Sequence, residues 1–252
     1  MVPNTNNVQP GGNNSSLSFL DKMFKFSERG SSLKTEVIGG VTTFLTMAYI
    51  VFVNPAILSE AGMDKAALIT VTILATAIGT LIFAILGNAP FALAPGMGLN
   101  AFFTYSLVIG AGIPWQTGLG VVFLSGCVFF TLAVTGLRKT IADAIPRELA
   151  VASSAGIGLF LAFVGLKNMG VIIANPDTIV SLADFTPTVL IALFALILMA
   201  ILEYKKVKGG ILISIVVATI ISVIFGFVEL PTAIISTPPS IAPVAFKLDI
   251  VG

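Results

Sequence analysis

The chain has 252 residues, of which 56% are hydrophobic and only 10% are charged, and its formal net charge is +1. Soluble domains usually carry about 25% charged residues, so this composition excludes a water-soluble fold and predicts a polytopic membrane protein. The balanced charge argues against nucleic-acid binding, and a chain with one cysteine and no histidine has no plausible ligand set for a zinc or iron site.

Residues 1–35 are expected to form a cytoplasmic N-terminal segment. The first 16 residues are rich in Asn, Gly and Ser and lack the apolar core of a signal peptide, so we expect them to be disordered. The residues that follow place aromatic side chains beside Lys22, Lys25 and Arg29, which is typical of an amphipathic segment on a membrane surface. A polar leader that carries a few apolar residues is the alternative.

Residues 36–230 are predicted to form an all-α membrane domain of about seven spanning helices, and residues 231–252 an extracytoplasmic Pro-rich segment. Asn54-Pro55 is expected to end the first span, Pro146 to precede the fifth, and Pro187 to lie near the start of the sixth. The apolar runs, cut at charges, prolines and glycines, give candidate spans at 37–57, 66–86, 89–110, 116–137, 149–171, 187–203 and 209–228.

Lysine and arginine residues are unevenly divided between the two sides of this predicted bundle. When seven spans alternate, ten of them lie on the side of the N-terminus and three on the other side. Because cytoplasmic loops accumulate Lys and Arg, the division predicts a cytoplasmic N-terminus and an extracytoplasmic C-terminus. The ten are Lys22, Lys25, Arg29, Lys34, Arg138, Lys139, Arg147, Lys205, Lys206 and Lys208, and the three are Lys65, Lys167 and Lys247.

The third predicted span is interrupted by prolines and glycines. Pro90 and Pro95 each remove a backbone donor and disfavour helix at the preceding residue, and glycines follow directly after Pro95. We therefore expect an extended first half and a short helix that begins near Met97 and ends near Gly110. Extended backbone at membrane depth has unpaired N–H and C=O groups, so it must be buried in protein or line a wet cavity.

This interruption marks a candidate binding site. The half-helix would direct free N–H groups and the positive end of its dipole toward an acceptor-rich or anionic ligand. Asn100, in its first turn, offers both a donor and an acceptor, which suits the mixed edges of a heterocyclic base. A proline-kinked helix in which Asn100 caps or bonds a neighbour is the alternative. The candidate residues at this turn are Pro95, Gly96, Met97, Gly98 and Asn100.

A polar stripe on the first span could line the same cavity. Thr42, Thr46 and Tyr49 recur at helical spacing on an otherwise apolar helix. Hydroxyl groups are also common as ordinary contacts between membrane helices, and that alternative stays open. The threonines at 72, 76 and 80 on the second span are interpreted as a packing surface.

None of the twelve acidic residues falls near the middle of a predicted span. Proton-coupled transporters usually hold an ionisable group deep in the membrane, and this chain offers none. An odd number of spans, one interrupted helix and a missing coupling residue suggest one member of a pair of inverted repeats. We therefore expect this sequence to be an N-terminal half, a truncated form or one subunit of a split transporter.

Three stretches resemble the adenine/guanine/hypoxanthine permeases, a branch of the xanthine/uracil permease group of nucleobase:cation symporters. They are GGVTTFLTMAYIVFVNPAIL (39–58), NAPFALAPGMGLNAFFTYSLV (88–108) and AIPRELAVASSAGIGLFLAFVGLKN (144–168). The resemblance implies fourteen spans in two inverted seven-helix repeats, and cation-coupled, usually proton-coupled, uptake of purine bases. It places the third-span asparagine of that family on Asn100 and the flanking turn on residues 95–98.

The resemblance also sets the expected partners and location. It implies a purine nucleobase, a coupling cation, usually a proton, the lipid bilayer, and a missing C-terminal repeat or second membrane chain; a second copy in a homodimer is a further candidate. A multi-pass location in the plasma membrane, no cofactor and no enzymatic activity are expected. The alternatives are an anion transporter of the same fold and a membrane subunit that does not itself transport.

Overall fold

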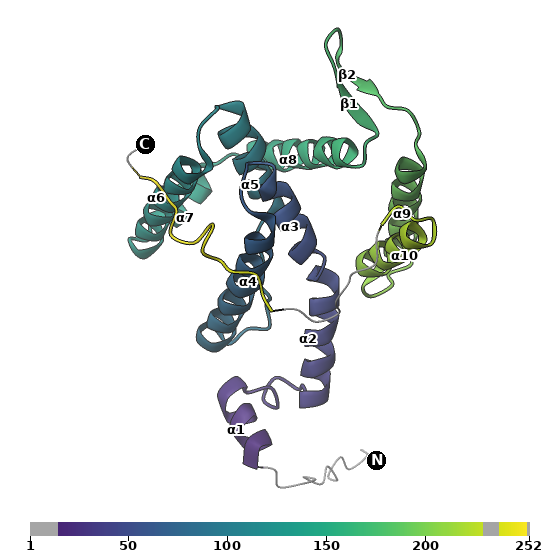
Figure 1. Ribbon diagram of the computed structural model, residues 1–252. Helices are drawn as coiled ribbons and strands as arrows, with labels where there is room; N and C mark the ends of the chain where they lie inside the picture. The colour runs from purple at the N-terminus through teal and green to yellow at the C-terminus, as the bar shows by residue number, and fades with distance from the viewer. Residues whose placement is uncertain (1–14, 229–236, 251–252) are drawn as a thin grey trace.

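The computed structural model describes residues 15–228 and 237–250. The expected disorder of the first residues and part of the predicted Pro-rich segment lie outside these ranges. The helices are α1 (Ser15–Phe24), α2 (Leu33–Met47), α3 (Ile50–Ser59), α4 (Lys65–Gly87), α5 (Met97–Ala101), the π-helix η1 (Phe102–Gly110), α6 (Trp115–Val134), α7 (Leu137–Ala144), α8 (Arg147–Asn168), α9 (Pro187–Tyr204) and α10 (Gly210–Ile224), and the strands are β1 (Ile172–Asn175) and β2 (Ile179–Leu182) (Figure 1).

The helices match the predicted pattern of apolar segments. Within the described residues, five helical segments are long and apolar enough to cross a membrane: Leu33–Ser59, Lys65–Gly87, Trp115–Val134, Arg147–Asn168 and Pro187–Tyr204. Two shorter apolar helices, Met97–Gly110 and Gly210–Ile224, lie where the third and seventh spans were predicted. The chain is therefore a polytopic, mostly helical membrane protein. The pairing of seven spans with a second, inverted repeat stays a prediction.

The first span ends later than predicted. Asn54-Pro55 does not terminate it, because both residues lie inside α3 and are buried. The segment changes from α2 to α3 at Ala48 and Tyr49, which both keep right-handed helical backbone angles. Pro55 removes one backbone donor but does not stop the helix, which continues to Ser59. The Asn54 side chain is therefore buried within α3, and the span ends at Ser59 and not at Asn54-Pro55.

A short β-hairpin between α8 and α9 was not predicted. Strands β1 and β2 pair antiparallel, with Ile172 opposite Leu182 and Asn175 opposite Ile179. The Asn175 carboxamide oxygen accepts hydrogen bonds from the backbone N–H groups of Asp177 and Thr178, which closes the turn. The two strands read Ile-Ile-Ala-Asn and Ile-Val-Ser-Leu, which do not alternate between apolar and polar residues, so the sequence carries no strand pattern here.

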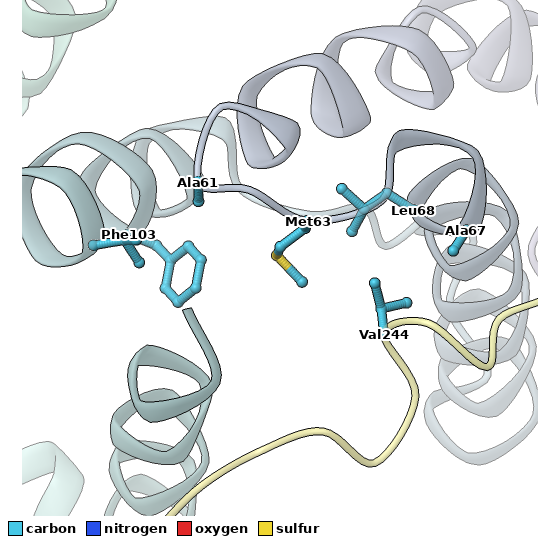
Figure 2. Close-up of a cluster of buried hydrophobic side chains, with 7 residues drawn as sticks. Ala61, Met63, Ala67, Leu68, Phe103 and Val244 are labelled. Atoms are coloured by element: carbon cyan, nitrogen blue, oxygen red, sulfur yellow. The ribbon is translucent and has the colours of Figure 1, made fainter. Parts of the chain in front are cut away.

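The buried core is small and lies where α4, η1 and the C-terminal segment meet (Figure 2). Figure 2 shows Val244 of that segment near Met63 and Leu68, with Phe103 approaching from the other side. Elsewhere, large apolar side chains are exposed along α2, α4, α6, α8, α9 and α10. An apolar surface of this extent requires lipid or another apolar protein surface to cover it.

The described C-terminal residues, 237–250, run back across the helices and do not extend away from them (Figure 1). The Thr70 hydroxyl donates to the backbone oxygen of Pro239 at 3.0 Å, and the backbone N–H of Asp249 donates to the backbone oxygen of Gln116 at 3.0 Å. These contacts join the start of α4 to the start of α6. We call residues 237–250 the C-terminal strap.

Candidate functional site

The third span is broken at the predicted place. Helix α4 ends at Asn88, whose backbone is left-handed (φ 43°, ψ 45°), and residues 88–96 form neither helix nor strand. Gly96 is extended (φ −77°, ψ 108°), and helix resumes at Met97 and continues as a π-helix to Gly110. At the start of the break, the Arg29 side chain donates from Nη2 to the backbone carbonyl oxygen of Asn88 at 2.9 Å. The expected half-helix from Met97 to Gly110 is therefore present.

Thr80 of α4 satisfies the backbone of the extended segment. Its hydroxyl oxygen accepts from the Leu93 N–H at 3.0 Å, and the same hydroxyl lies 3.2 Å from the Leu93 carbonyl oxygen, to which it can donate. Extended backbone in an apolar environment needs such partners. Thr80 was interpreted as part of a packing surface, and the structure gives it this additional role.

Asn100 belongs to a buried polar cluster at the start of the half-helix. Its side-chain N–H donates to the carboxamide oxygen of Asn54 on α3, and the Asn54 amide nitrogen donates to the Thr72 hydroxyl of α4 at 2.8 Å. Asn54 is 3% exposed and Thr72 is 2% exposed, whereas Asn100 is half-buried. We call Asn54, Thr72 and Asn100 the amide cluster. Three separate helices thus contribute to one hydrogen-bonded group.

The predicted turn residues, 95–98, lie just before Asn100 in the chain. The Gly96 carbonyl oxygen accepts from the backbone N–H groups of Leu99 and Asn100, both at 3.1 Å, so it closes the first turn. A Cβ atom on Gly98 would lie 2.9 Å from Cγ2 of Ile157 on α8, closer than ordinary contact allows. Gly98 is thus the position that lets α8 approach the half-helix. Pro95 and Met97 flank these two glycines.

The predicted stripe on the first span is not hydrogen-bonded to the amide cluster. The hydroxyls of Thr42 and Thr46 donate to carbonyl oxygens of their own helix, those of Ile38 and Thr43, each at 2.8 Å. Thr46 also lines a cavity of about 340 Å³ against the loop between α9 and α10. Tyr49 lies at the junction of α2 and α3. A role for these three residues in binding stays a prediction.

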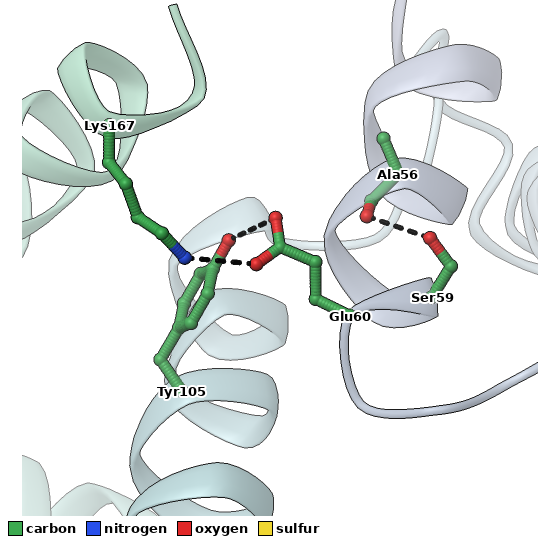
Figure 3. A network of polar contacts seen from close by, with 5 residues as sticks. All are labelled: Ala56, Ser59, Glu60, Tyr105 and Lys167. Carbon is green, nitrogen blue, oxygen red and sulfur yellow. Dashed lines mark hydrogen bonds and ion pairs between the residues drawn. The ribbon is translucent and has the colours of Figure 1, made fainter. Parts of the chain in front are cut away.

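A second polar cluster, missed from the sequence, joins α3, η1 and α8. Glu60, at the end of α3, accepts from the Tyr105 hydroxyl at 2.9 Å and from Lys167 Nζ at 3.1 Å (Figure 3). The ammonium group also lies 4.9 Å from the centre of the Tyr105 ring. Residues so distant in sequence carry no local pattern that predicts this contact. The one hint in the sequence was that Glu60 and Lys167, which have opposite charges, each lie at the end of an apolar helix.

Neither cluster brings three candidate metal ligands together. Within the described residues, no group of three or more His, Cys, Asp or Glu side chains is placed to hold a metal ion. The partners of Asn100 are a neutral amide and, beyond it, a neutral hydroxyl. The amide cluster therefore offers hydrogen-bond donors and acceptors that carry no formal charge.

Comparison with known proteins places the sequence among transport proteins. The Xan_ur_permease model, described as a permease family, matches residues 34–249. The chain is 48% identical to a putative permease of Methanocaldococcus jannaschii, over 94% of this chain and 54% of that protein. It is 43% identical to the adenine permease AdeP of Escherichia coli, over 92% and 52% of the two chains. It is 45% identical to the guanine/hypoxanthine permease PbuG of Bacillus subtilis, over 89% and 53%. The chain spans about half the length of these curated relatives.

Proposed function

Because the chain belongs to the xanthine/uracil permease family, whose members are transporters and not enzymes, we propose that it is the N-terminal half of a purine nucleobase transporter. The observation that carries this proposal is Asn100, held by Asn54 in the first turn of a half-helix that follows broken backbone. Relatives named as adenine and guanine/hypoxanthine permeases support purines as the substrate class.

The chemistry of the site suits a purine base. A base presents ring nitrogens, N–H groups and carbonyl or amino groups along its edges, and a carboxamide can both donate to and accept from such an edge. The free N–H groups at the start of the half-helix add donors for ring nitrogens or carbonyl oxygens. Gly96, which is exposed and has no side chain, leaves the backbone accessible at this turn.

Transport of this kind needs a driving ion and a second half, and both belong to the proposal. We propose cation-coupled symport, with a proton as the cation, and a C-terminal repeat or a second membrane chain that completes the site. The uneven division of Lys and Arg supports a cytoplasmic N-terminus and an extracytoplasmic strap in the plasma membrane. A homodimer would cover part of the exposed apolar surface.

An anion transporter of the same fold is the second candidate. The half-helix N-terminus favours it, since such an end attracts negative charge. The neutral partners of Asn100 favour a base instead, because the amide cluster brings no positive side chain to a ligand. The third candidate is a membrane subunit with only an assembly role, which does not itself transport.

Uptake of radiolabelled adenine, guanine and hypoxanthine tests these candidates. The complete reading frame that encodes these residues is expressed in bacteria that lack their own purine uptake. We expect saturable uptake that Asn100→Ala abolishes and that Asn175→Ala, a matched amide loss in the hairpin turn, leaves unchanged.

Absence of saturable uptake would overturn the purine assignment. Inhibition of uptake by sulfate would favour the anion transporter. Failure to transport, together with co-purification of a second membrane chain, would favour the assembly subunit. Collapse of the membrane potential or of the proton gradient, applied separately, identifies the coupling ion.

A further inference from the structure

The Asn54 carboxamide engages both neighbours in the amide cluster. Its oxygen accepts from Asn100, and its nitrogen donates to the Thr72 hydroxyl at 2.8 Å. A reversed Asn54 amide would place its N–H group against the Asn100 N–H group, and two donors cannot bond each other. The Thr72 hydroxyl accepts from the Asn54 amide nitrogen and holds the Asn54 carboxamide in place, with its oxygen toward Asn100.

Burial makes this orientation costly to change. Asn54 and Thr72 are 3% and 2% exposed, so water does not compensate for a lost partner. A buried donor or acceptor without a partner costs more free energy than a formed hydrogen bond contributes. Thr72, Asn54 and Asn100 therefore form one hydrogen-bonded unit, in which Thr72 acts on Asn100 only through Asn54.

The unit leaves a defined part of Asn100 for a ligand. One N–H of its amide is used by Asn54, so the carboxamide oxygen and the second N–H are the remaining groups. Asn100 is half-buried, whereas its two supporting residues are buried, so it is the member of the unit accessible to a ligand. A ligand that matches both remaining groups presents an N–H donor next to an acceptor.

Two further hydroxyls near the unit have no partner. Thr76 lies one turn after Thr72 on α4, and Thr104 lies about one turn after Asn100 in η1; the side-chain oxygen of each is buried without a hydrogen bond. Buried polar groups in native structures are normally paired, so each of these hydroxyls needs a partner from a ligand or water. The helix faces beside the unit therefore carry hydroxyl groups that lack a hydrogen-bond partner.

From these observations we propose that Asn54 and Thr72 are positioning residues that fix the Asn100 amide, so that it selects bases whose edge carries an N–H donor beside an acceptor. This inference rests on the proposed function, and it adds residues that act through Asn100 and do not touch the base. The lactam edge of hypoxanthine or guanine and the amino edge of adenine both have this pattern, in different places. The fixed amide thus sets the relative affinity for these bases.

The matched pair Thr72→Val and Thr72→Ser tests the inference. Valine keeps the shape and removes the acceptor, whereas serine keeps the acceptor. We expect Thr72→Val to raise KM about 3- to 10-fold, as expected for one hydrogen bond, and to change the ratio of adenine to hypoxanthine uptake. The maximal rate per transporter in the membrane should change less than KM. Thr72→Ser should keep the KM and the ratio of the wild type.

The outcomes separate this inference from the proposed function. Transport that is lost in Asn100→Ala but keeps wild-type KM and base ratio in Thr72→Val would overturn the positioning role and leave the function intact. Absence of base uptake by the wild type would overturn both. If Thr72→Val fails to reach the membrane, Thr72→Cys, a weaker acceptor of similar size, should give an intermediate KM; an unchanged KM and base ratio in that variant would overturn the inference.

Discussion

Lys167, near the end of α8, donates from Nζ to Oε2 of Glu60 at 3.1 Å and so ties the fifth predicted span to the end of the first. The other Glu60 oxygen accepts from the Tyr105 hydroxyl, and the Tyr105 ring also packs edge-on against Phe160 of α8. Ile157 of α8 lies beside Gly98, and Val164 of the same helix is buried, so the α8 face that runs from Ile157 to Lys167 meets the third span. The ion pair between Lys167 and Glu60 lies at the C-terminal end of this face.

Reversal of charge at this pair should weaken the contact, and a double reversal should restore it. The two side chains are 49% and 34% exposed, so the pair contributes at most about 1 kcal/mol. We expect Lys167→Glu to lower the melting temperature of the purified protein more than Lys167→Gln does, because two carboxylates would repel each other. The double variant Glu60→Lys with Lys167→Glu should recover most of the loss. Equal melting temperatures for all variants would show that the pair does not hold α8.

A side chain at Gly98 should push α8 away from the half-helix. The Cβ of Gly98→Ala would lie 2.9 Å from Cγ2 of Ile157, and such overpacking costs about 1–3 kcal/mol. We expect a lower melting temperature and reduced uptake. Adding Ile157→Ala should relieve the clash, so the two substitutions should couple in a double-mutant cycle. Gly156→Ala, with open space around its Cβ, is the control and should not destabilise the protein. Additive effects of the two substitutions would contradict the contact.

The broken third span could be predicted from sequence because its causes are local. Two prolines remove donors and two glycines lack side chains, and each of these properties belongs to the residue itself. The start at Met97 and the end at Gly110 follow from the same reasoning. The helix starts after Pro146 and at Pro187 are also local consequences, and both are confirmed.

The partners of Asn100 could not be predicted, because they depend on packing between distant segments. Asn54 precedes a proline, a pair that usually ends a helix, so 54–55 was interpreted as the end of the span and Asn54 was not considered as a partner of Asn100. In the structure, α3 tolerates the proline, and the buried Asn54 lies between Thr72 and Asn100. The polar stripe at Thr42 and Thr46 has regular helical spacing, yet its hydroxyls bond their own helix. Spacing alone does not identify the neighbour that a helix face meets.

A side chain at Gly120 should displace the C-terminal strap from α6. A Cβ at this position would overlap the backbone oxygen of Asp249, and backbone atoms cannot move aside as a flexible side chain can. We expect faster amide hydrogen exchange at the end of the strap in Gly120→Ala, because the Asp249 N–H would lose its bond to Gln116. Gly126→Ala on the same helix has no neighbour within 4 Å and serves as control. Equal exchange in the two variants would mean that the strap does not lie on α6.

Removal of the Thr80 hydroxyl should loosen the extended half of the third span. Thr80→Val keeps the shape but takes away the hydroxyl that bonds both the N–H and the C=O of Leu93. We expect a loss of about 1–3 kcal/mol in stability and faster hydrogen exchange in residues 89–96, measured by mass spectrometry. Thr80→Ser keeps the hydroxyl and should stay near the wild type. Uptake should fall in the valine variant, because the half-helix that carries Asn100 begins where this segment ends. A valine variant with wild-type exchange in 89–96 would show that this backbone has another partner, and the link from Thr80 to the binding turn would be lost.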